Sequence, residues 1–528
     1  MYSFFRKLRQ VFTKKNKYGI NNKNIKEGEE LIEKILLDDH ARMKLSVYGK
    51  VMTLWPGEYS LDHVRENLDF YFSSTRFKKI LCDIQNDLEQ FTEIKLLHNK
   101  NKLSIPEQLV QYTQYQHYLS TESVPYKLLI SILTEQDEDL AAFCNRHFIS
   151  RSTCFRQTKK LAEYLKEYNI NLNLSNLTLS GSEMLIRIIF FNFFWFVSLG
   201  ESLDSIPYSQ EVRALIYKHE GSQHKNKFDL GKKQASLHCL ICLLRIENNH
   251  FTDIYRLSRD SFIPSETNID FFYDFFKIAN LRLDILEVNS LFYLFYYWPF
   301  LTSNQDIRVP IVQYSYQQPS NEVKDILEEF QKHCQTFIGT FQFEKEPALL
   351  LNLYLSIGNF SMFKQKIPLT TLFISSYIQD KYPLLRILTI KIEGFWKKIA
   401  QRKNYTWLKS CVSELAFLQA SLLYPYYSEI DENYKLKVGF VNVSEHLISA
   451  EILNLGKKIP FVDIERLTLP ITEEYDFFIF GSPLLIPAGL DSSKYTVLDF
   501  CHYSDFETNL YQRLIEVHHL KLQILFSN

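Results

Sequence analysis

The stretch FISRSTCFRQTKKLAEYLKEY, residues 148–168, most constrains the fold because its apolar residues have strict helical spacing. Cys154, Leu161 and Leu165 recur at i, i+7 and i+11, so they share one buried face, with Phe155 at its edge. Ser150 stands where a helix N-cap is expected. Thr153, Arg156, Gln157, Lys159 and Lys160 fall largely on the exposed side. The pattern predicts a helix that is buried on one side and exposed and basic on the other.

The neighbouring residues predict what this helix belongs to. Residues 125–135 and 137–147 each read as a shorter amphipathic helix, and residues 171–180 alternate apolar and polar side chains around a Ser-Asn turn. Three helices and a hairpin are typical of a winged helix, whose second motif helix enters DNA. The alternative is an ordinary surface helix with solvated charges. We expect DNA contacts from its exposed side chains: Arg151, Ser152, Thr153, Arg156, Lys159 and Lys160.

A related pattern occurs earlier in the chain. Residues 61–70 and 75–91 read as helices, with Ser73 or Ser74 as the cap of the second, and residues 93–105 read as a hairpin. The second helix opens with SSTRFKK, similar to SRSTCFRQTKK in the later module. Two such modules in tandem indicate winged helices more strongly than a single match does. The matching candidate DNA contacts in this first module are Ser74, Thr75, Arg76, Lys78 and Lys79.

The 528 residues are too many for one core, so we expect a mainly α, multi-domain protein. Residues 182–302 and 303–425 are aromatic-rich and helical, interrupted near 302–319 by strand-like and turn residues. Strands alternate with a helix after residue 430, which predicts a small parallel α/β domain. The predicted domains are a basic lead-in (1–37), two winged helices (38–106 and 107–181), two helical bundles (182–302 and 303–425) and the α/β domain (430–528).

Charge places the expected polyanion contact in the N-terminal third. The net charge is −1 overall, but residues 1–180 carry 26 Lys and Arg against 22 Asp and Glu, whereas the remainder carries 34 against 39.

The longest apolar run, residues 184–199, contains Arg187 and Asn192 and predicts a buried helix, not a membrane span. Cys239 and Cys242 lie in an apolar helical run and have no second pair to complete a zinc site. These features favour a cytoplasmic, reduced protein without a metal or other cofactor.

In this order, the segments resemble the Mga family of virulence regulators of Gram-positive bacteria, which includes the anthrax toxin activator. The residues that carry the resemblance are SRSTCFRQTKKL and the following NLNLSNLTLSGSEMLIRIIFFNFFWF. The resemblance implies tandem winged helices, two phosphotransferase-system regulation domains (PRDs) and a C-terminal domain similar to an EIIB component. It also implies promoter binding, activation of transcription, dimerisation and control by histidine phosphorylation from a phosphocarrier protein. For an activator, RNA polymerase is a further partner.

Four histidines are candidates for that phosphorylation. His219 and His224 lie in the polar segment YKHEGSQHKNK, and His333 lies on a polar helix. His238 is also a candidate, although its apolar surroundings favour a core histidine. An ordinary surface histidine is the alternative for each. In the EIIB-like part, the loop at residues 441–446 reads VNVSEH and has no cysteine, so phosphocysteine chemistry is not expected.

We therefore expect a DNA-binding regulator that is not an enzyme. The chain has no glycine-rich phosphate loop and no nucleophile–base signature. An RNA-binding antiterminator is one alternative, because PRDs also occur there. A phosphotransferase component that uses the C-terminal domain, and a scaffold protein with degenerate winged helices, are two others.

Overall fold

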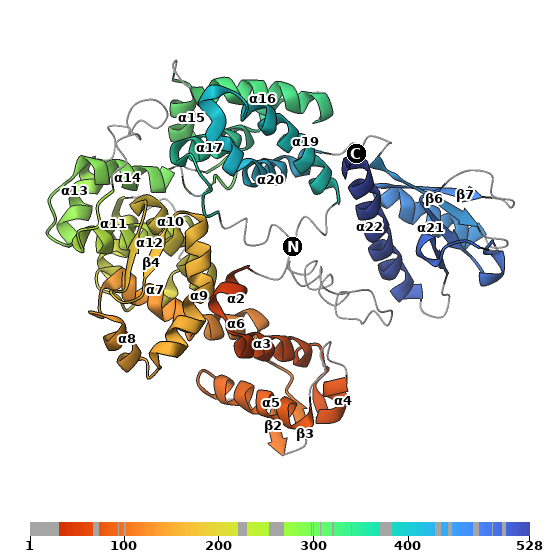
Figure 1. Ribbon diagram of the computed structural model, residues 1–528, viewed down its shortest axis with the longest axis horizontal. Coiled ribbons are helices and arrows are strands. Elements are labelled where there is room, and N and C mark those ends of the chain that lie inside the picture. The colour runs from red at the N-terminus through yellow and green to blue at the C-terminus, as the bar shows by residue number, and fades with distance from the viewer. Residues whose placement is uncertain are drawn as a thin grey trace. The chain divides into compact units, whose positions relative to one another are not determined.

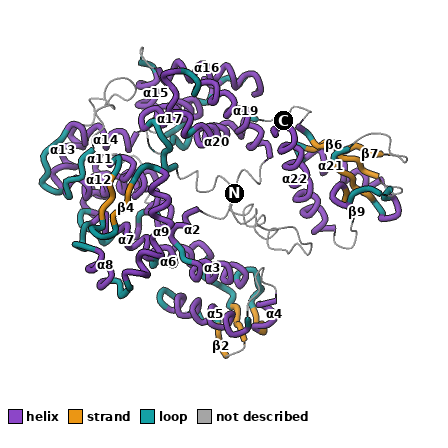
Figure 2. The backbone as a smooth tube through the Cα atoms, in the orientation of Figure 1, coloured by secondary structure: helices purple, strands orange, loops and turns teal. Residues whose placement is uncertain are grey.

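The protein is mainly helical and also contains a four-stranded parallel sheet near its C-terminus (Figures 1 and 2). This computed structural model describes residues 31–66, 73–92, 94–99, 102–219, 230–252, 269–296, 298, 300–306, 308–318, 322–338, 341–369, 383–427, 434–441, 446–467, 475–487, 489–498 and 503–527. The chain divides into two compact units, Met1–Val323 with Ile357–Ile374 and Lys324–Ser356 with Ser375–Asn528.

The first unit starts with helices that share a core with a small antiparallel sheet. The helices of this core are α3 (Asp39–Val51), α4 (Leu61–Glu66) and α5 (Ser74–Glu89), and the short helix α2 (Leu31–Leu36) precedes them. The strands are β1 (Gly57–Ser60), β2 (Leu97–Asn99) and β3 (Lys102–Ile105), in the order β1-β3-β2. The predicted apolar stripe of α5, which includes Phe77 and Leu81, is buried in this core. The sequence predicts only the hairpin β2–β3 and misses β1, because β1 is short and its side chains are mostly exposed.

Helix α6 (Tyr112–Thr121) closes the same core. The Tyr48 hydroxyl on α3 donates to the Val110 carbonyl at 2.6 Å, and the Tyr115 hydroxyl on α6 donates to the Asp87 carboxylate at 2.6 Å. The rings of Tyr48 and Tyr115 have their centroids 4.7 Å apart. Since α6 also contacts α7 and α10, it belongs to the cores on both sides of the predicted boundary at residue 106.

The next elements match the second predicted module. They are α7 (Val124–Thr134), α8 (Leu140–Arg146), α9 (Arg151–Glu167), β4 (Asn171–Asn173), β5 (Thr178–Ser180) and α10 (Glu183–Ser198). β4 and β5 pair antiparallel, which confirms the predicted hairpin. Nearly all of α10 is buried, as predicted for its apolar run. Across the described ranges we find no helix with the length and apolarity that a membrane crossing requires.

Further helices complete the first unit. They are η2 (Glu201–Leu203), α11 (Ser209–His219), α12 (Leu230–Glu247), α13 (Ile269–Ile278), α14 (Ile285–Tyr296) and α15 (Val309–Tyr316). The prediction of strand-like structure near residues 302–319 is wrong, because α15 is a helix. Its proline sits in the first turn, where a helix tolerates it, and Val309 and Val312 are buried at i and i+3.

The second unit has a helical part and a sheet. Its helical part contains most of α16 (Glu322–Ile338), η5 (Phe343–Lys345), the start of α17 (Pro347–Phe363), α19 (Pro383–Ile399), η7 (Lys403–Ser410), α20 (Val412–Leu423) and η8 (Tyr424–Tyr426). Trp396 on α19 donates its indole N–H to Gln419 on α20 at 2.6 Å, and Gln419 donates to Ser356 at 2.9 Å. This buried polar chain fixes the packing of three helices. The apolar segment 369–378 of the sequence lies, after its first residue, outside the described residues.

The C-terminal sheet is parallel throughout, as predicted. It contains β6 (Leu436–Val441), β7 (Val462–Leu467), β8 (Phe477–Phe480) and β9 (Tyr495–Val497) in the order β7-β6-β8-β9. The other elements are α21 (His446–Lys458), η10 (Pro483–Leu485), η11 (Ser492–Lys494) and α22 (Tyr503–Ser527). The residue pattern after β9 does not predict α22, which contacts β6. Its His518 ring contacts the Tyr434 carbonyl at 2.6 Å, just before β6.

Candidate nucleic-acid interface

The N-terminus of α9 is fixed by the predicted cap. The Ser150 hydroxyl accepts the backbone N–H of Thr153 at 3.1 Å, which satisfies one of the free donors at the start of the helix. Cys154, Leu161 and Leu165 are all buried, so the predicted apolar stripe is confirmed. Thr158 is buried beside them and donates its hydroxyl to the Cys154 carbonyl at 2.8 Å. One face of α9 is therefore held firmly in the core.

The opposite face of α9 is open and basic. Arg151, Ser152, Arg156, Lys159 and Lys160 are exposed and Thr153 is half-buried. Lys159 lies 3.8 Å from Glu163, and both side chains are mostly exposed. Such a surface pair contributes little stability, so the lysine can exchange this partner for a phosphate at small cost. The face has the composition that a polyanion contact requires.

Phe155 lies next to buried Cys154, at the edge of the stripe, and is 51% exposed. The position lies four residues after Arg151 and four before Lys159, so these three residues form a row on the helix surface. An aromatic ring therefore lies within the basic face.

The turn that leads into α9 exposes a second aromatic ring. The Ile149 N–H donates to the Cys144 carbonyl at 3.0 Å and the Phe148 N–H donates to the Asn145 carbonyl at 3.4 Å. These two bonds form a Schellman motif at the end of α8. Phe148 takes the left-handed position of the motif, with φ +53°, and 96% of its side chain is exposed.

The hairpin is fixed to the other end of α8. Asn173 accepts the backbone N–H groups of Ser175 and Asn176 at 3.0 and 3.3 Å, which closes the turn. The Ser175 carbonyl then accepts the N–H of Leu140, the first residue of α8, at 3.2 Å. The hairpin therefore braces the helix pair α8–α9.

A glycine sets the exit from the hairpin into α10. Gly181 has φ +150°, and a Cβ there would lie 2.9 Å from the Asn169 carbonyl oxygen. Only glycine fits this close approach without a shift of the backbone. Beyond the turn, Phe193 of α10 packs edge-on against Tyr164 of α9, with ring centroids 5.7 Å apart. The buried side of α9 is thus supported by α10.

One flank of α9 meets the N-terminal helices. α2 packs against α9 and α7, and Gln157 donates to Asp38 at 2.8 Å. The same aspartate caps α3 by accepting the Ala41 N–H at 2.8 Å. Because this flank of α9 is occupied, the open surface is the side that carries Arg151, Phe155 and Lys159.

Helix α5 of the first module presents a similar surface. Ser73 is its cap, because its hydroxyl accepts the Arg76 N–H at 3.3 Å, and Ser74 is the first helical residue. The candidate residues Ser74, Thr75, Arg76 and Lys79 are exposed and Lys78 is half-buried. The Arg76 guanidinium also lies 3.1 Å from the Met43 sulfur. The two predicted recognition helices thus place basic residues in their exposed first turns.

The histidine candidates differ in their surroundings. His238 is buried on α12, and its ring stacks on Phe191 with the centroids 3.7 Å apart. Burial, with a smaller effect from Arg308, lowers the pKa of His238 to about 3. A ring in this position has no access to a phosphocarrier, which agrees with its apolar sequence context.

Of the other three candidates, only the side chain of His333 lies among the described residues. His333 on α16 is half-buried, with its Nε2 atom 3.3 Å from the Lys391 carbonyl and its ring stacked on Phe395 at 5.1 Å. His219 is the last residue of α11, and its side chain is outside the described part. His224 lies outside the described residues altogether, as does most of the loop after β6 that lacks a cysteine, residues 442–445.

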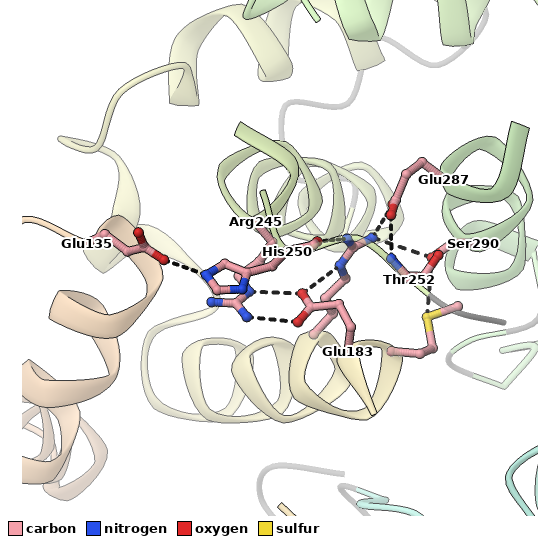
Figure 3. A network of polar contacts seen from close by, with 9 residues as sticks. Glu135, Glu183, Arg245, His250, Thr252, Glu287 and Ser290 are labelled. Atoms are coloured by element: carbon pink, nitrogen blue, oxygen red, sulfur yellow. Dashed lines mark hydrogen bonds and ion pairs between the residues drawn. The ribbon is translucent and has the colours of Figure 1, made fainter. Parts of the chain in front are cut away.

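A buried network of charges joins α10 to the helices that follow (Figure 3). Glu183 accepts from Arg187 at 3.1 Å and from Arg245 at 2.9 and 2.8 Å. Arg187 also donates to Glu287 at 2.6 Å and to the His250 carbonyl at 2.9 Å. The two positive charges of Arg187 and Arg245 are balanced by the two negative charges of Glu183 and Glu287. All four side chains are buried.

The network reaches the helix-turn-helix elements at a second point. The His250 ring contacts the carboxylate of Glu135 at 2.5 Å, and Glu135 is the left-handed C-cap of α7 (Figure 3). On the other side, Glu287 accepts the Thr252 N–H at 2.6 Å. The sequence contains a signal for part of this arrangement, because Arg187 interrupts an otherwise apolar run. Its partner Glu183 lies four residues earlier on the same helix, whereas Glu287 and His250 are distant in sequence and could not be predicted.

The sequence raises the question of a metal site, because Cys239 and Cys242 lie close together in the chain. Among the described residues, no group of three or more His, Cys, Asp or Glu side chains could hold a metal ion. Cys239 and Cys242 are buried on α12, as the sequence predicts. Burial raises the pKa of the Cys242 thiol to about 12.

Comparison with known proteins finds one family. Residues 108–194 match the family model of the Mga helix-turn-helix domain. The matched range contains α6 to α9 and the hairpin, and it ends within α10. No curated protein sequence matches the chain. The match therefore covers the elements that carry the exposed basic face of α9.

Proposed function

We propose, from the Mga helix-turn-helix domain at residues 108–194, that the protein is a transcriptional regulator that binds duplex promoter DNA through α9. The observation that carries this proposal is the exposed basic face of α9 within that domain. A helix whose apolar side is fixed in the core can enter the major groove without distortion. The braced hairpin and the buried support from α10 hold it in a defined orientation.

The side chains of α9 divide by chemistry. Arg151 and Arg156 can donate two hydrogen bonds to guanine O6 and N7 or to phosphate, whereas Lys159 and Lys160 neutralise phosphates. Ser152 and Thr153 have hydroxyl groups that can donate to phosphate or base edges. In this proposal, the equivalent residues of α5 bind a second segment of DNA.

The test is duplex binding by the full chain across a salt series. Each phosphate contact contributes about 0.9 to the slope of log affinity against log salt concentration. We expect Arg156→Ala/Lys160→Ala to weaken binding and to flatten the slope by up to about two units. Lys397→Ala/Lys398→Ala on α19 is a matched control, since both residues are exposed basic residues far along the chain from the domain.

Two results would contradict the proposal. Duplex binding that is absent, or that does not respond to the α9 substitutions, would remove α9 as the interface. Tighter binding to hairpin RNA than to duplex DNA would favour the antiterminator alternative. Binding can be measured by fluorescence anisotropy. Titrations with labelled duplex DNA and with labelled hairpin RNA as the probe distinguish these outcomes.

We propose further that the helical segments after α10 act as PRDs and regulate DNA binding. A phosphate on His219 at the end of α11, or on His333 of α16, would add negative charge there and shift helix packing within its own unit; His224, outside the described residues, is the third candidate. For a phosphate within the first unit, Glu183, Arg187 and Glu287 provide a path for such a shift, because they join α10 to α14. Incubation with a phosphocarrier protein and phosphate donor, followed by mass spectrometry, tests which histidine is modified.

We also propose that the C-terminal α/β part mediates self-association, as an EIIB-like domain would. The support is on α22, where Leu520 and Ile524 lie at i and i+4 and are 59% and 65% exposed. Two large apolar side chains on one face of a helix favour burial against another surface. A homodimer would place two pairs of recognition helices on one promoter.

A further inference from the structure

Phe148 occupies a position that costs conformational energy. The left-handed region favours glycine and asparagine, and a side chain with a Cβ is disfavoured there. Phe148 has φ +53° and no compensating burial, because 96% of its side chain is exposed. A strained residue that gains nothing from the core is a candidate for a functional contact.

Phe155 gives a second, independent observation. Its ring is 51% exposed in the second turn of α9, in the row between Arg151 and Lys159. A ring at the centre of the buried stripe would have stabilised the fold, but this one lies on the open side. Two phenylalanines are thus exposed within eight residues of each other, at the start of the predicted recognition helix.

The charge around the two rings identifies their partner. Arg151, Arg156, Lys159 and Lys160 are exposed on the same helix, while its exposed Glu163 lies 3.8 Å from Lys159. An apolar surface framed by cations fits a partner that has an anionic backbone and apolar groups between its charges. Duplex DNA has this pattern in the major groove, where each thymine displays a C5 methyl group.

We infer that Phe148 and Phe155 contact thymine C5 methyl groups in the major groove and so help to select the DNA sequence. The inference rests on the proposed function of α9. In this arrangement the arginines and lysines position the helix on the phosphates, and the two rings discriminate thymine from cytosine. The strain at Phe148 is retained because the ring is needed outside the fold.

The experiment starts from a duplex that the full-length protein selects from a random-sequence pool. The same duplex is then made with deoxyuridine in place of thymidine, which removes the C5 methyl groups and leaves the base pairing unchanged. The wild-type protein should bind the deoxyuridine duplex about fourfold more weakly for each buried methyl group. Phe155→Ala keeps the contact of Phe148, so it should discriminate between the two duplexes about fourfold less than the wild type.

Phe148→Asn provides a readout that a structural role would not give. Asparagine adopts the left-handed conformation readily, so this variant should melt at a higher temperature than the wild type. It should nevertheless discriminate less between the two duplexes. The control is Tyr273→Ala, which removes a 52% exposed aromatic residue from α13. This variant should keep the wild-type melting temperature and the wild-type discrimination between the two duplexes.

The outcomes separate this inference from the proposed function. If the protein selects no duplex, the proposed function fails and this inference fails with it. If it binds DNA with the expected salt dependence but treats thymidine and deoxyuridine alike, only the inference is wrong. The inference is also wrong if Phe148→Asn and Phe155→Ala both keep the full discrimination of the wild type.

Discussion

Ser150 caps the N-terminus of α9 and lies next to the side of the helix that is proposed to face DNA. Its hydroxyl accepts the Thr153 N–H and lies 2.9 Å from the hydroxyls of Ser152 and Thr153. Removing the cap in Ser150→Ala should lower the free energy of unfolding by about 1 kcal/mol. Urea unfolding followed by circular dichroism measures this change.

Ser150→Asp separates the two effects. A carboxylate keeps the cap and interacts favourably with the helix N-terminus, so stability should equal or exceed that of the wild type. Its negative charge next to the DNA-facing side should weaken duplex binding. Equal DNA affinity for Ser150→Asp and wild type would mean that the start of α9 does not approach the phosphates.

His238 predicts a pH dependence of stability. Its folded pKa is about 3, because burial disfavours the charged ring, whereas the ring in the unfolded chain titrates near ~6.5. As the pH falls below ~6.5, the unfolded chain takes up a proton that the folded chain excludes. The contribution of His238 is therefore fully present above this pH, and stability falls by up to about 1.4 kcal/mol per pH unit toward pH 3.

His238→Phe removes the titrating group and keeps an aromatic ring against Phe191. Unfolding in urea at neutral and at mildly acidic pH should show a smaller loss of stability in this variant than in the wild type. The comparison between the two proteins cancels the other titrating groups. Equal losses would mean that His238 is protonated in the folded protein or is already open to solvent.

At the scale of elements, periodicity predicts the helices that have one buried face. The stripes of α5 and α9 and their serine caps follow directly from residue spacing. The pattern fails where an element has little apolar periodicity or a mixed one. β1 has exposed side chains, and the segment VPIVQYSY of α15 is rich in β-branched and aromatic residues that favour strands.

The same reasoning explains which parts of the candidate site could be predicted. The charges and hydroxyls of α9 are recognised by residue type, and their exposure follows from the buried stripe. The exposure of Phe148 depends on a left-handed backbone conformation, which nothing in its residue type suggests. The partners Glu287 and His250 of Arg187 lie 100 and 63 residues away along the chain, so only the fold brings them together.

The buried charge network should make a large contribution to the link between α10 and α14. Glu287→Gln removes one of the two carboxylates that neutralise Arg187 and leaves a buried guanidinium with reduced compensation. Breaking a buried pair in this way costs about 3–5 kcal/mol. We expect a loss of this size in urea unfolding of the full chain.

A surface pair provides the control for that measurement. Arg213 pairs with Asp204, and each side chain is 49% exposed, so Arg213→Gln should cause no measurable change. A similar stability for Glu287→Gln and wild type would show that the network contributes specificity of packing without net stability. In that case, the link between α10 and α14 would depend on apolar contacts alone.

For the whole molecule, self-association would determine how many recognition helices act together. Two linked modules on each copy gain affinity because the second contact is intramolecular, and a dimer doubles the number of contacts. Leu520→Glu/Ile524→Glu places two charges on the exposed apolar face of α22. We expect the wild-type chain to sediment as a dimer and this variant to sediment as a monomer.

The control is another exposed leucine in the same sheet-containing part. Leu484 in η10 is 94% exposed, and Leu484→Glu should leave the sedimentation coefficient unchanged.

The monomeric Leu520→Glu/Ile524→Glu variant should also bind duplex DNA with lower affinity and a smaller salt slope, because fewer phosphates are neutralised in each complex. A wild-type monomer, or a double variant that still dimerises, would exclude this face of α22 as the contact. A monomeric variant with unchanged DNA affinity would mean that one copy of the chain provides the whole interface.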